Sequence, residues 1–158
     1  MRWLHLIMAT LVGGCAVTGQ TDLDAVRPEN GRSLLYVYRK STFVGSANSD
    51  VSFLHIDGKP VGRINIGGNR VISVTPGEHK LRTSQSFFGS DTGKSVAEFA
   101  VTVSPDATSF VRYEEGLASL SVISVGKTTV GNGTGYFRFE KVEPNIARQE
   151  IADTQTLN

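Results

Sequence analysis

The sequence predicts an all-β fold, namely a single antiparallel β-sandwich or barrel-like domain with a short C-terminal helix. Apolar and β-branched residues alternate with polar ones over short runs, which is the pattern of half-buried strands. Turn signals separate these runs about every 8–12 residues, which indicates about eight or nine strands. The chain has 158 residues, of which 17 are glycine. That length suits one domain.

The front of the chain has the plan of a secretory signal peptide. Arg2 gives a short basic start, residues 3–12 form an apolar run, and Gly13 and Gly14 follow it. The apolar run is shorter than the roughly 20 residues that a membrane-spanning helix needs. We therefore expect residues 1–14 to be a signal that is removed.

The only cysteine of the chain comes directly after this segment. The run Leu11, Val12, Gly13, Gly14 and Cys15 resembles the lipobox of bacterial lipoproteins, although Val12 stands where leucine is commoner. The small residues let a peptidase approach the backbone, and the cysteine thiol accepts a diacylglyceryl group. An ordinary cleaved signal and a buried N-terminal strand with a core cysteine are the two alternatives.

The lipobox resemblance implies a mature chain that begins at Cys15 and carries a diacylglyceryl thioether and an amide-linked acyl chain such as palmitate. At about 0.8 kcal/mol per buried CH₂, several acyl chains anchor a protein stably. Ala16 stands where an aspartate retains enteric-type lipoproteins in the inner membrane. The resemblance therefore implies the outer membrane, with the domain facing the periplasm. Residues 15–32 are expected to be a flexible tether to a β-domain at residues 33–142.

Charge and cysteine content argue against several kinds of site. The formal net charge is +1, and loss of Arg2 with the signal leaves 15 lysines and arginines against 15 aspartates and glutamates. A balanced charge offers no basic surface to nucleic acid, so none is expected as a partner. The lone Cys15 can form neither an intrachain disulfide nor a multi-cysteine metal site. We expect no cofactor and no metal.

The first strand is expected at residues 33–39, followed by a polar loop at 40–50 with Phe43 and Val44 as its core anchors. Alternate residues of this strand fall on two faces, one with Leu34, Tyr36 and Tyr38, the other with Leu35, Val37 and Arg39. Residues 51–85 predict four short strands. Their turns are Asp57-Gly58, Gly67-Gly68-Asn69 and Pro76-Gly77, which suit positive φ at glycine or a type II turn.

The remaining elements follow from the same signals. Strands are expected at 96–104, 108–113, 117–125 and 136–142, loops at 86–95 and 126–135, and a helix at 145–152 within a C-terminal segment, 143–158, that ends in a frayed polar tail. Residues 117–125 also suit a short helix, but their alternation favours a strand. Phe87 and Phe88 are expected in a loop folded over the core.

Four motifs, taken in order, resemble a known family. They are Tyr36-Val37-Tyr38-Arg39, Gly45-Ser46-Ala47, the run IDGKPVG at residues 56–62, and Pro76-Gly77-Glu78-His79. Their order is similar to that of a family of bacterial lipoproteins known as domain of unknown function 2846, and the middle resembles PEGA-type β-domains. The resemblance covers residues 33–142 and implies no catalytic residue set.

Two groups of side chains have types that could carry chemistry. His55 and Asp57 are spaced to share a strand face, and His79 could face them, which would suit a triad or a metal site. We expect instead that Asp57 forms its turn and that the histidines lie on the surface. Glu114 and Glu115 are adjacent, so in a strand they point to opposite faces and cannot act together.

The function expected first is that of a lipid-anchored envelope protein, not an enzyme, that binds or supports a partner. The expected partners are the membrane, through the lipid, and envelope proteins or glycans. The alternative is a periplasmic enzyme or small-ligand carrier with polar side chains converging in a barrel interior. Its candidate residues are His55, His79, Arg112 and Glu114.

Overall fold

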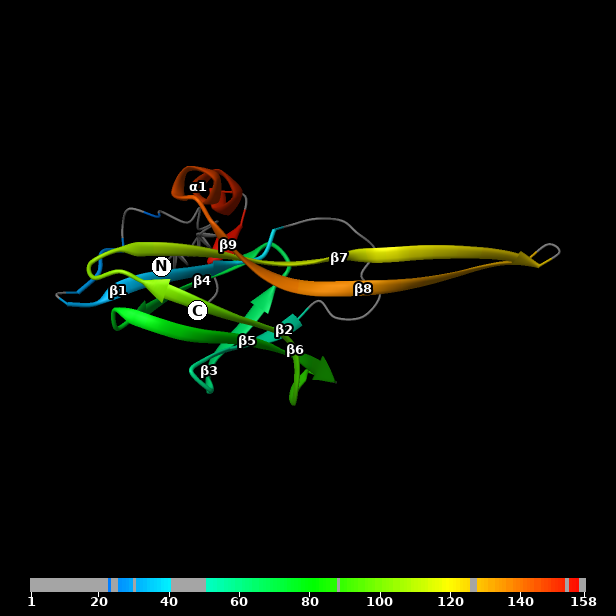
Figure 1. Ribbon diagram of the computed structural model, residues 1–158, viewed down its shortest axis with the longest axis horizontal. Coiled ribbons are helices and arrows are strands. Elements are labelled where there is room, and N and C mark those ends of the chain that lie inside the picture. The colour runs from blue at the N-terminus through cyan, green and yellow to red at the C-terminus, as the bar shows by residue number, and fades with distance from the viewer. Residues whose placement is uncertain are drawn as a thin grey trace, which may run out of the picture.

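A computed structural model of the protein describes residues 23, 26–29, 31–40, 51–87, 89–125, 128–152 and 154–156. They form two packed β-sheets and one helix, which confirms the predicted all-β sandwich (Figure 1). The five-stranded sheet has the order β8-β7-β1-β4-β9 and the four-stranded sheet the order β3-β2-β5-β6. The elements are β1 (Ser33–Tyr38), β2 (Val51–Ile56), β3 (Lys59–Asn65), β4 (Gly68–Val74), β5 (Gly77–Phe87), β6 (Ser90–Val103), β7 (Thr108–Val125), β8 (Thr128–Val142), α1 (Pro144–Ala152) and β9 (Gln155–Thr156).

Most neighbouring strands are antiparallel, but two pairs depart from the antiparallel prediction. β1 is antiparallel to β4 on one side and parallel to β7 on the other. β9 is parallel to β4. Between β1 and β7 the chain builds β4 and the whole four-stranded sheet. Parallel neighbours need a long connection of this kind.

β1 lies at the centre of the five-stranded sheet, and all six of its residues are buried. Leu35 and Val37 point into the core between the sheets, whereas Leu34, Tyr36 and Tyr38 point into a second core under α1. The two faces predicted for this strand are therefore confirmed. A strand covered on both faces needs apolar residues at nearly every position, as the sequence SLLYVY has.

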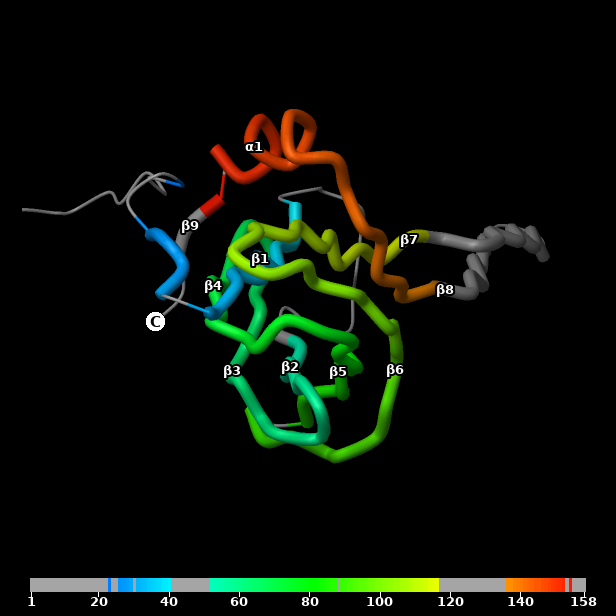
Figure 2. The backbone as a smooth tube through the Cα atoms, turned by 60° about the vertical axis from the view of Figure 1, so that its left-hand side comes forward, coloured from blue at the N-terminus to red at the C-terminus, as the bar shows by residue number. Residues whose placement is uncertain are grey.

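Helix α1 covers the face of the five-stranded sheet that is turned away from the other sheet (Figure 2). Pro144 begins it, since the first helical turn needs no N–H at that position. Ala147 and Ile151 are four residues apart, so they share one helix face, and both are buried. The predicted helix is confirmed, and it encloses the second core.

The segment after α1 was predicted to fray, but part of it belongs to the sheet. The Asn69 Nδ2 donates a hydrogen bond to the buried Thr154 Oγ1 at 2.7 Å. Gln155 and Thr156 then pair with β4 as strand β9. One buried hydrogen bond and one short strand pairing of two residue pairs thus hold this polar segment in place. It has no apolar pattern from which its position could be predicted.

The turn at Asp57-Gly58 is confirmed. Asp57 has φ 51° and Gly58 has φ 78°, and two successive positive φ values are the conformation of a type I′ hairpin turn. Aspartate tolerates positive φ better than most side chains, and glycine takes it without strain.

The prediction of a loop at residues 86–95 is wrong. β5 continues to Phe87 and β6 begins at Ser90, so most of this segment belongs to strands. Residues 90–95 are polar and exposed, so this end of the hairpin lacks the apolar alternation by which a strand is recognised. Phe87 is 66% exposed and does not fold over the core. The predictions for Phe43, Val44 and Phe88 lie outside the described residues.

Candidate functional site

A long hairpin extends from one end of the sandwich. β7 and β8 pair in antiparallel register from Phe110 opposite Val142 out to Val125 opposite Thr128. β1 accompanies β7 only as far as Arg112. Beyond that point no other described strand pairs with the hairpin, and Figure 1 shows it projecting as a two-stranded ribbon. We name residues 117–125 and 128–135 the arm, and residues 112–116 and 136–140 its root.

Half of the arm was predicted as a loop, because residues 126–135 are rich in glycine. The structure instead makes residues 128–135 part of β8, so that prediction is wrong. Glycines 131, 133 and 135 recur at every second position, which is the period of a strand. In the ladder, Gly131 lies opposite Val122 and Gly133 opposite Leu120. Glycine within a strand weakens it because it has no side chain to pack, and it leaves room for another backbone to approach the strand closely.

The arm carries almost no charge. Between Gly116 and Gly135 the one charged residue is Lys127, and there is no proline. Natural edge strands are usually protected from pairing by charged side chains, prolines or a covering element. Among the described residues, the two strands of the arm have a register shift between Leu117 and Ser119, which is a bulge of the kind that also protects edges, but they have no charged residue, no proline and no covering strand. Their free backbone N–H and C=O groups make the arm a template for another strand.

The outer face of the root is held by three successive cross-strand pairs. Arg112 lies opposite Glu140, with a guanidinium nitrogen 2.6 Å from the carboxylate. Glu114 lies opposite Arg138 and forms an ion pair with it. Gly116 lies opposite Tyr136, whose ring covers it. Opposite charges in facing positions stabilise a ladder, so the root is a firm base for the arm.

The inner face of the root is held by aromatic pairs. The ring of the fully buried Tyr113 lies 5.1 Å from that of Phe139 and 6.2 Å from that of Phe137, measured between centroids. The Arg39 guanidinium carbon lies over the Tyr113 ring, 5.6 Å from its centroid. The Arg39 Nη2 is 2.7 Å from a carboxylate oxygen of Glu115. This contact is close enough to be ionic although its angles do not make a hydrogen bond.

Glu114 and Glu115 point to opposite faces, as predicted. Glu114 pairs with arginines on the outer face, and Glu115 pairs with Arg39 on the inner face. Each carboxylate neutralises a different cation, so the two do not form one acid–base site. Their role in the structure is to fix the root on both sides.

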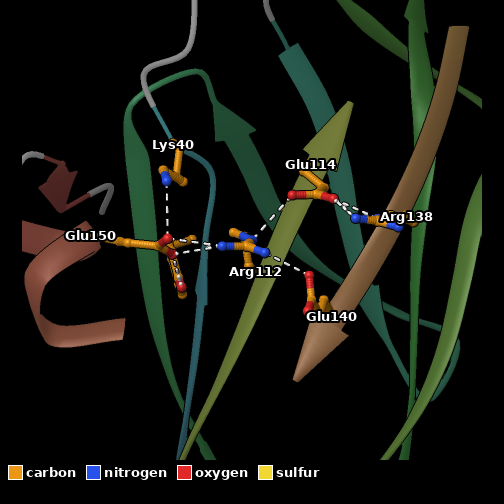
Figure 3. A network of polar contacts seen from close by, with 7 residues as sticks. Lys40, Arg112, Glu114, Arg138, Glu140 and Glu150 are labelled. Atoms are coloured by element: carbon orange, nitrogen blue, oxygen red, sulfur yellow. Dashed lines mark hydrogen bonds and ion pairs between the residues drawn. The ribbon is translucent and has the colours of Figure 1, made fainter. Parts of the chain in front are cut away.

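A polar cluster joins the root to α1 (Figure 3). Glu150 of α1 accepts hydrogen bonds from the Tyr38 hydroxyl at 2.6 Å, Lys40 at 2.9 Å and Arg112 at 2.8 Å. Burial and the hydrogen bond to the Glu150 carboxylate both raise the pKa of Tyr38. Burial alone would raise the pKa of Glu150, but the hydrogen bonds from Tyr38 and Lys40 and the charge of Arg112 lower it. Arg112 thus connects the helix to Glu114 and Glu140 of the root.

His79 is buried, so the prediction of a surface position is wrong. Its Nδ1 lies 2.7 Å from a carboxylate oxygen of Asp57, and its Nε2 lies 2.7 Å from the Thr75 carbonyl oxygen. Both partners accept, so both ring nitrogens donate and the ring carries a positive charge. Burial lowers the pKa of His79, but these hydrogen bonds outweigh it and raise the pKa above its ordinary value. Asp57 also accepts from the Lys80 backbone N–H, so the group locks two turns together.

His55 is also buried, again contrary to prediction. Its Nε2 lies 2.8 Å from Asp91 Oδ2 and 3.1 Å from Ser84 Oγ, and Ser84 donates to Asp91 Oδ1. A catalytic triad needs the serine and the carboxylate on different ring nitrogens. Here one nitrogen meets both, and the serine proton is already directed to the carboxylate. The arrangement fastens the far end of the β5–β6 hairpin and does not activate a nucleophile.

The four residues considered for a polar interior do not converge. Arg112 and Glu114 lie on the outer face of β7, beside α1. His55 and His79 belong to the other sheet and pair with separate carboxylates. Among the described residues, no group of three or more histidines, cysteines or acidic residues is placed to hold a metal ion.

The lipid-attachment prediction, with Leu11, Val12, Gly13, Gly14 and Cys15, lies outside the described residues. Within the described part of the chain, no helix is both long and apolar enough to span a membrane. Comparisons with models of protein families, with curated proteins and with solved structures found no match. The resemblance to a lipoprotein family of unknown function therefore stays a prediction, and the site is argued from its geometry.

Proposed function

We propose that this protein is a lipid-anchored module of the bacterial envelope that acts by binding and not by catalysis, with the β7–β8 arm as its binding element. The observation that carries this proposal is the arm itself, a two-stranded ribbon with free edges that continues past the sandwich. A hairpin of two strands is marginally stable alone in water. An uncharged two-stranded arm has exposed edges to which a strand of a partner can add.

The polar groups of the body support binding over catalysis. The ion pairs of the root and the cluster around Glu150 fix the arm and α1. The two buried histidines secure hairpins of the four-stranded sheet. Each set has a structural use, and the sets lie apart. A rigid domain that presents one extended element is suited to binding a partner, because a preorganised surface loses less conformational entropy on binding.

The first residues of the sequence support the anchoring part of this proposal. The signal-like residues 1–14 and Cys15 in its lipobox setting support a lipid-bearing N-terminus in the outer membrane. Leu23 packs against the core under α1, and Arg32 donates a hydrogen bond to the Ser73 carbonyl oxygen. In this proposal the part of the predicted tether before Leu23 would let the domain stand clear of the bilayer on the periplasmic side. The proposed partners are the membrane, through the lipid, and envelope proteins, through the arm.

Anchoring is tested by expressing the full chain in a Gram-negative host beside Cys15→Ala. We expect the membrane fraction to contain the wild type with an acyl-bearing Cys15 as its first residue, seen by intact-protein mass spectrometry. We expect Cys15→Ala to leave the membrane fraction. An unmodified Cys15 in a soluble wild-type protein would overturn the anchoring proposal.

Binding by the arm is tested in the same membranes by photo-crosslinking. A photoreactive residue replaces Val122 and, on irradiation, links to whatever protein contacts the arm. A discrete crosslinked species is expected for this position. The matched position is Thr102, an exposed residue of β6, where no such species is expected. Equal crosslinking at both positions, or none at either, would overturn the arm as the binding element.

A further inference from the structure

We propose that the occupant of the arm is a second copy of this chain, whose β7 edge pairs antiparallel with the β7 edge of the first. This inference rests on the proposed function and adds the identity of the partner. The edge concerned is the side of β7 that faces β1. β1 leaves it at Arg112, and from Tyr113 to Val125 no described strand takes its place.

The residues of this edge suit pairing with themselves. Two identical strands that pair antiparallel about a two-fold axis form a closed interface, in which residue i of one strand meets residue j of the other and residue j meets residue i. An axis at Ser121 would set Leu120 opposite Val122 and Ser119 opposite Ile123. No charged residue occurs from Leu117 to Val125, so the pairing would bring no like charges together.

The edge of β8 is less suited to the same role. Its arm segment contains Gly131, Gly133 and Gly135, and glycine weakens a strand because it has no side chain to pack. The β7 segment instead has Leu117, Leu120 and several β-branched residues, which favour a pleated ladder. Two arms joined through β7 would make a four-stranded sheet with the β8 strands outside.

The surroundings of the arm favour a copy over a different protein. Lipid-anchored copies share one surface and stand at the same height, which raises their effective concentration for one another. The root holds each arm in place through Arg112, Glu114 and the facing residues of β8, so little order is lost on pairing. A second copy needs no further chemistry, because the free backbone groups of one edge complement those of the other.

The test uses Ser121→Cys in the full chain, with oxidative disulfide formation in isolated membranes. A residue near the two-fold axis links to its own counterpart, so we expect a dimer of this chain on non-reducing gels. The matched control is Ser95→Cys, an exposed strand position on β6 away from the arm, for which we expect little dimer. Adding Val122→Lys to Ser121→Cys should reduce the dimer about tenfold, because each lysine would then face Leu120 of the other strand and the two lysines would be diagonal neighbours on one face of the pairing.

The outcomes separate this inference from the proposed function. If the wild type is anchored but Ser121→Cys gives no more dimer than Ser95→Cys, the inference is overturned and anchoring stands. A disulfide to a different protein at Ser121→Cys would also overturn it. If the wild type is soluble with an unmodified Cys15, so that anchoring fails, Ser121→Cys in the Cys15→Ala background still tests pairing in solution, since Cys15 is then absent. Circular dichroism of each variant must match the wild type, so that a loss of dimer reports the arm and not misfolding.

Discussion

The ring of Tyr136 lies directly over Gly116, its cross-strand partner at the point where the arm begins. A Cβ added to Gly116 would stand 2.6 Å from both the Cζ and the Oη of Tyr136. The Arg138 guanidinium carbon lies 5.4 Å from the centroid of the same ring. An aromatic ring that packs across a strand glycine supplies the contact that the glycine lacks. Glycine at this position is therefore part of the structure of the root.

Gly116→Ala is expected to destabilise the protein by about 1 kcal/mol, because the methyl group must push aside the ring and its contact with Arg138. In a Tyr136→Ala background the same change should stabilise by about 0.5 kcal/mol, since alanine restricts the unfolded chain more than glycine does. Gly116 does not have a positive φ, so alanine fits its backbone. Urea unfolding of the four proteins measures both effects, and the same sign in both backgrounds would contradict the account.

A second prediction concerns the ion pair inside the root. Arg39 is 2% exposed, so removing its partner leaves a buried charge. Glu115→Ala is expected to cost about 3–5 kcal/mol, and the double variant Arg39→Met, Glu115→Leu should recover most of it. Lys80→Ala is the control, because its pair with Glu98 is exposed on both sides and should contribute less than about 1 kcal/mol. Equal costs for the buried and the exposed variants, by urea unfolding, would refute this.

The sandwich could be predicted because its strands obey local rules. Alternation in β1 placed Leu35 and Leu34 on opposite faces, where two separate cores are found. The turn at Asp57-Gly58 could be predicted from these two residues alone. The parallel pairing of β1 with β7 could not be predicted in this way, because it depends on how a long connection returns, and no local pattern records that.

The candidate site was harder to predict, for two physical reasons. Residues 128–135 form a strand although they are glycine-rich, since pairing with β7 overrides a weak propensity. The burial of His55 and His79 depends on Asp91 and Asp57, and the pairing of each histidine with its carboxylate is visible only in the folded chain. What the sequence did contain was the two-residue period of the arm glycines.

The lock between His79 and Asp57 predicts a pH dependence of stability. The pKa of His79 is raised by folding, so its contribution is present below the ordinary histidine value and is lost as pH rises through the folded pKa. The hydrogen bonds from His79 and the Lys80 N–H lower the pKa of Asp57, so its contribution is present above the ordinary carboxyl value and is lost on acidification. Together they stabilise most between about pH 4 and 6.5.

Asp57→Asn tests this window, because asparagine also tolerates positive φ. The loss of unfolding free energy relative to wild type should be greatest near pH 5.5 and should shrink toward pH 9. Asp106→Asn is the matched control, since Asp106 also has a positive φ, 53°, in a turn. Its effect should not follow the same profile. Parallel profiles for the two variants would show that the lock with His79 has no part in the pH dependence.

The last prediction concerns Glu150, which ties α1 to the root. Glu150→Ala removes the acceptor for the Tyr38 hydroxyl and one partner of Arg112, and it should cost about 2–3 kcal/mol because partly buried donors lose their acceptor. Gln149→Ala is the control, since Gln149 is exposed on the same helix. It should change the unfolding free energy by less than about 0.5 kcal/mol.

The variant Glu150→Gln keeps an acceptor oxygen but loses the negative charge. It therefore separates the contribution of the charge to stability from that of the hydrogen bonds. Folding lowers the pKa of Glu150, so the contribution of its charge is present above the ordinary carboxyl pKa and is lost as pH falls through the folded value. The gap in unfolding free energy between wild type and Glu150→Gln should therefore close as the pH is lowered from 6 to 3. A difference that stays constant over this range would mean that Glu150 holds the helix by hydrogen bonding alone, and that its ion pairs with Lys40 and Arg112 contribute nothing through charge.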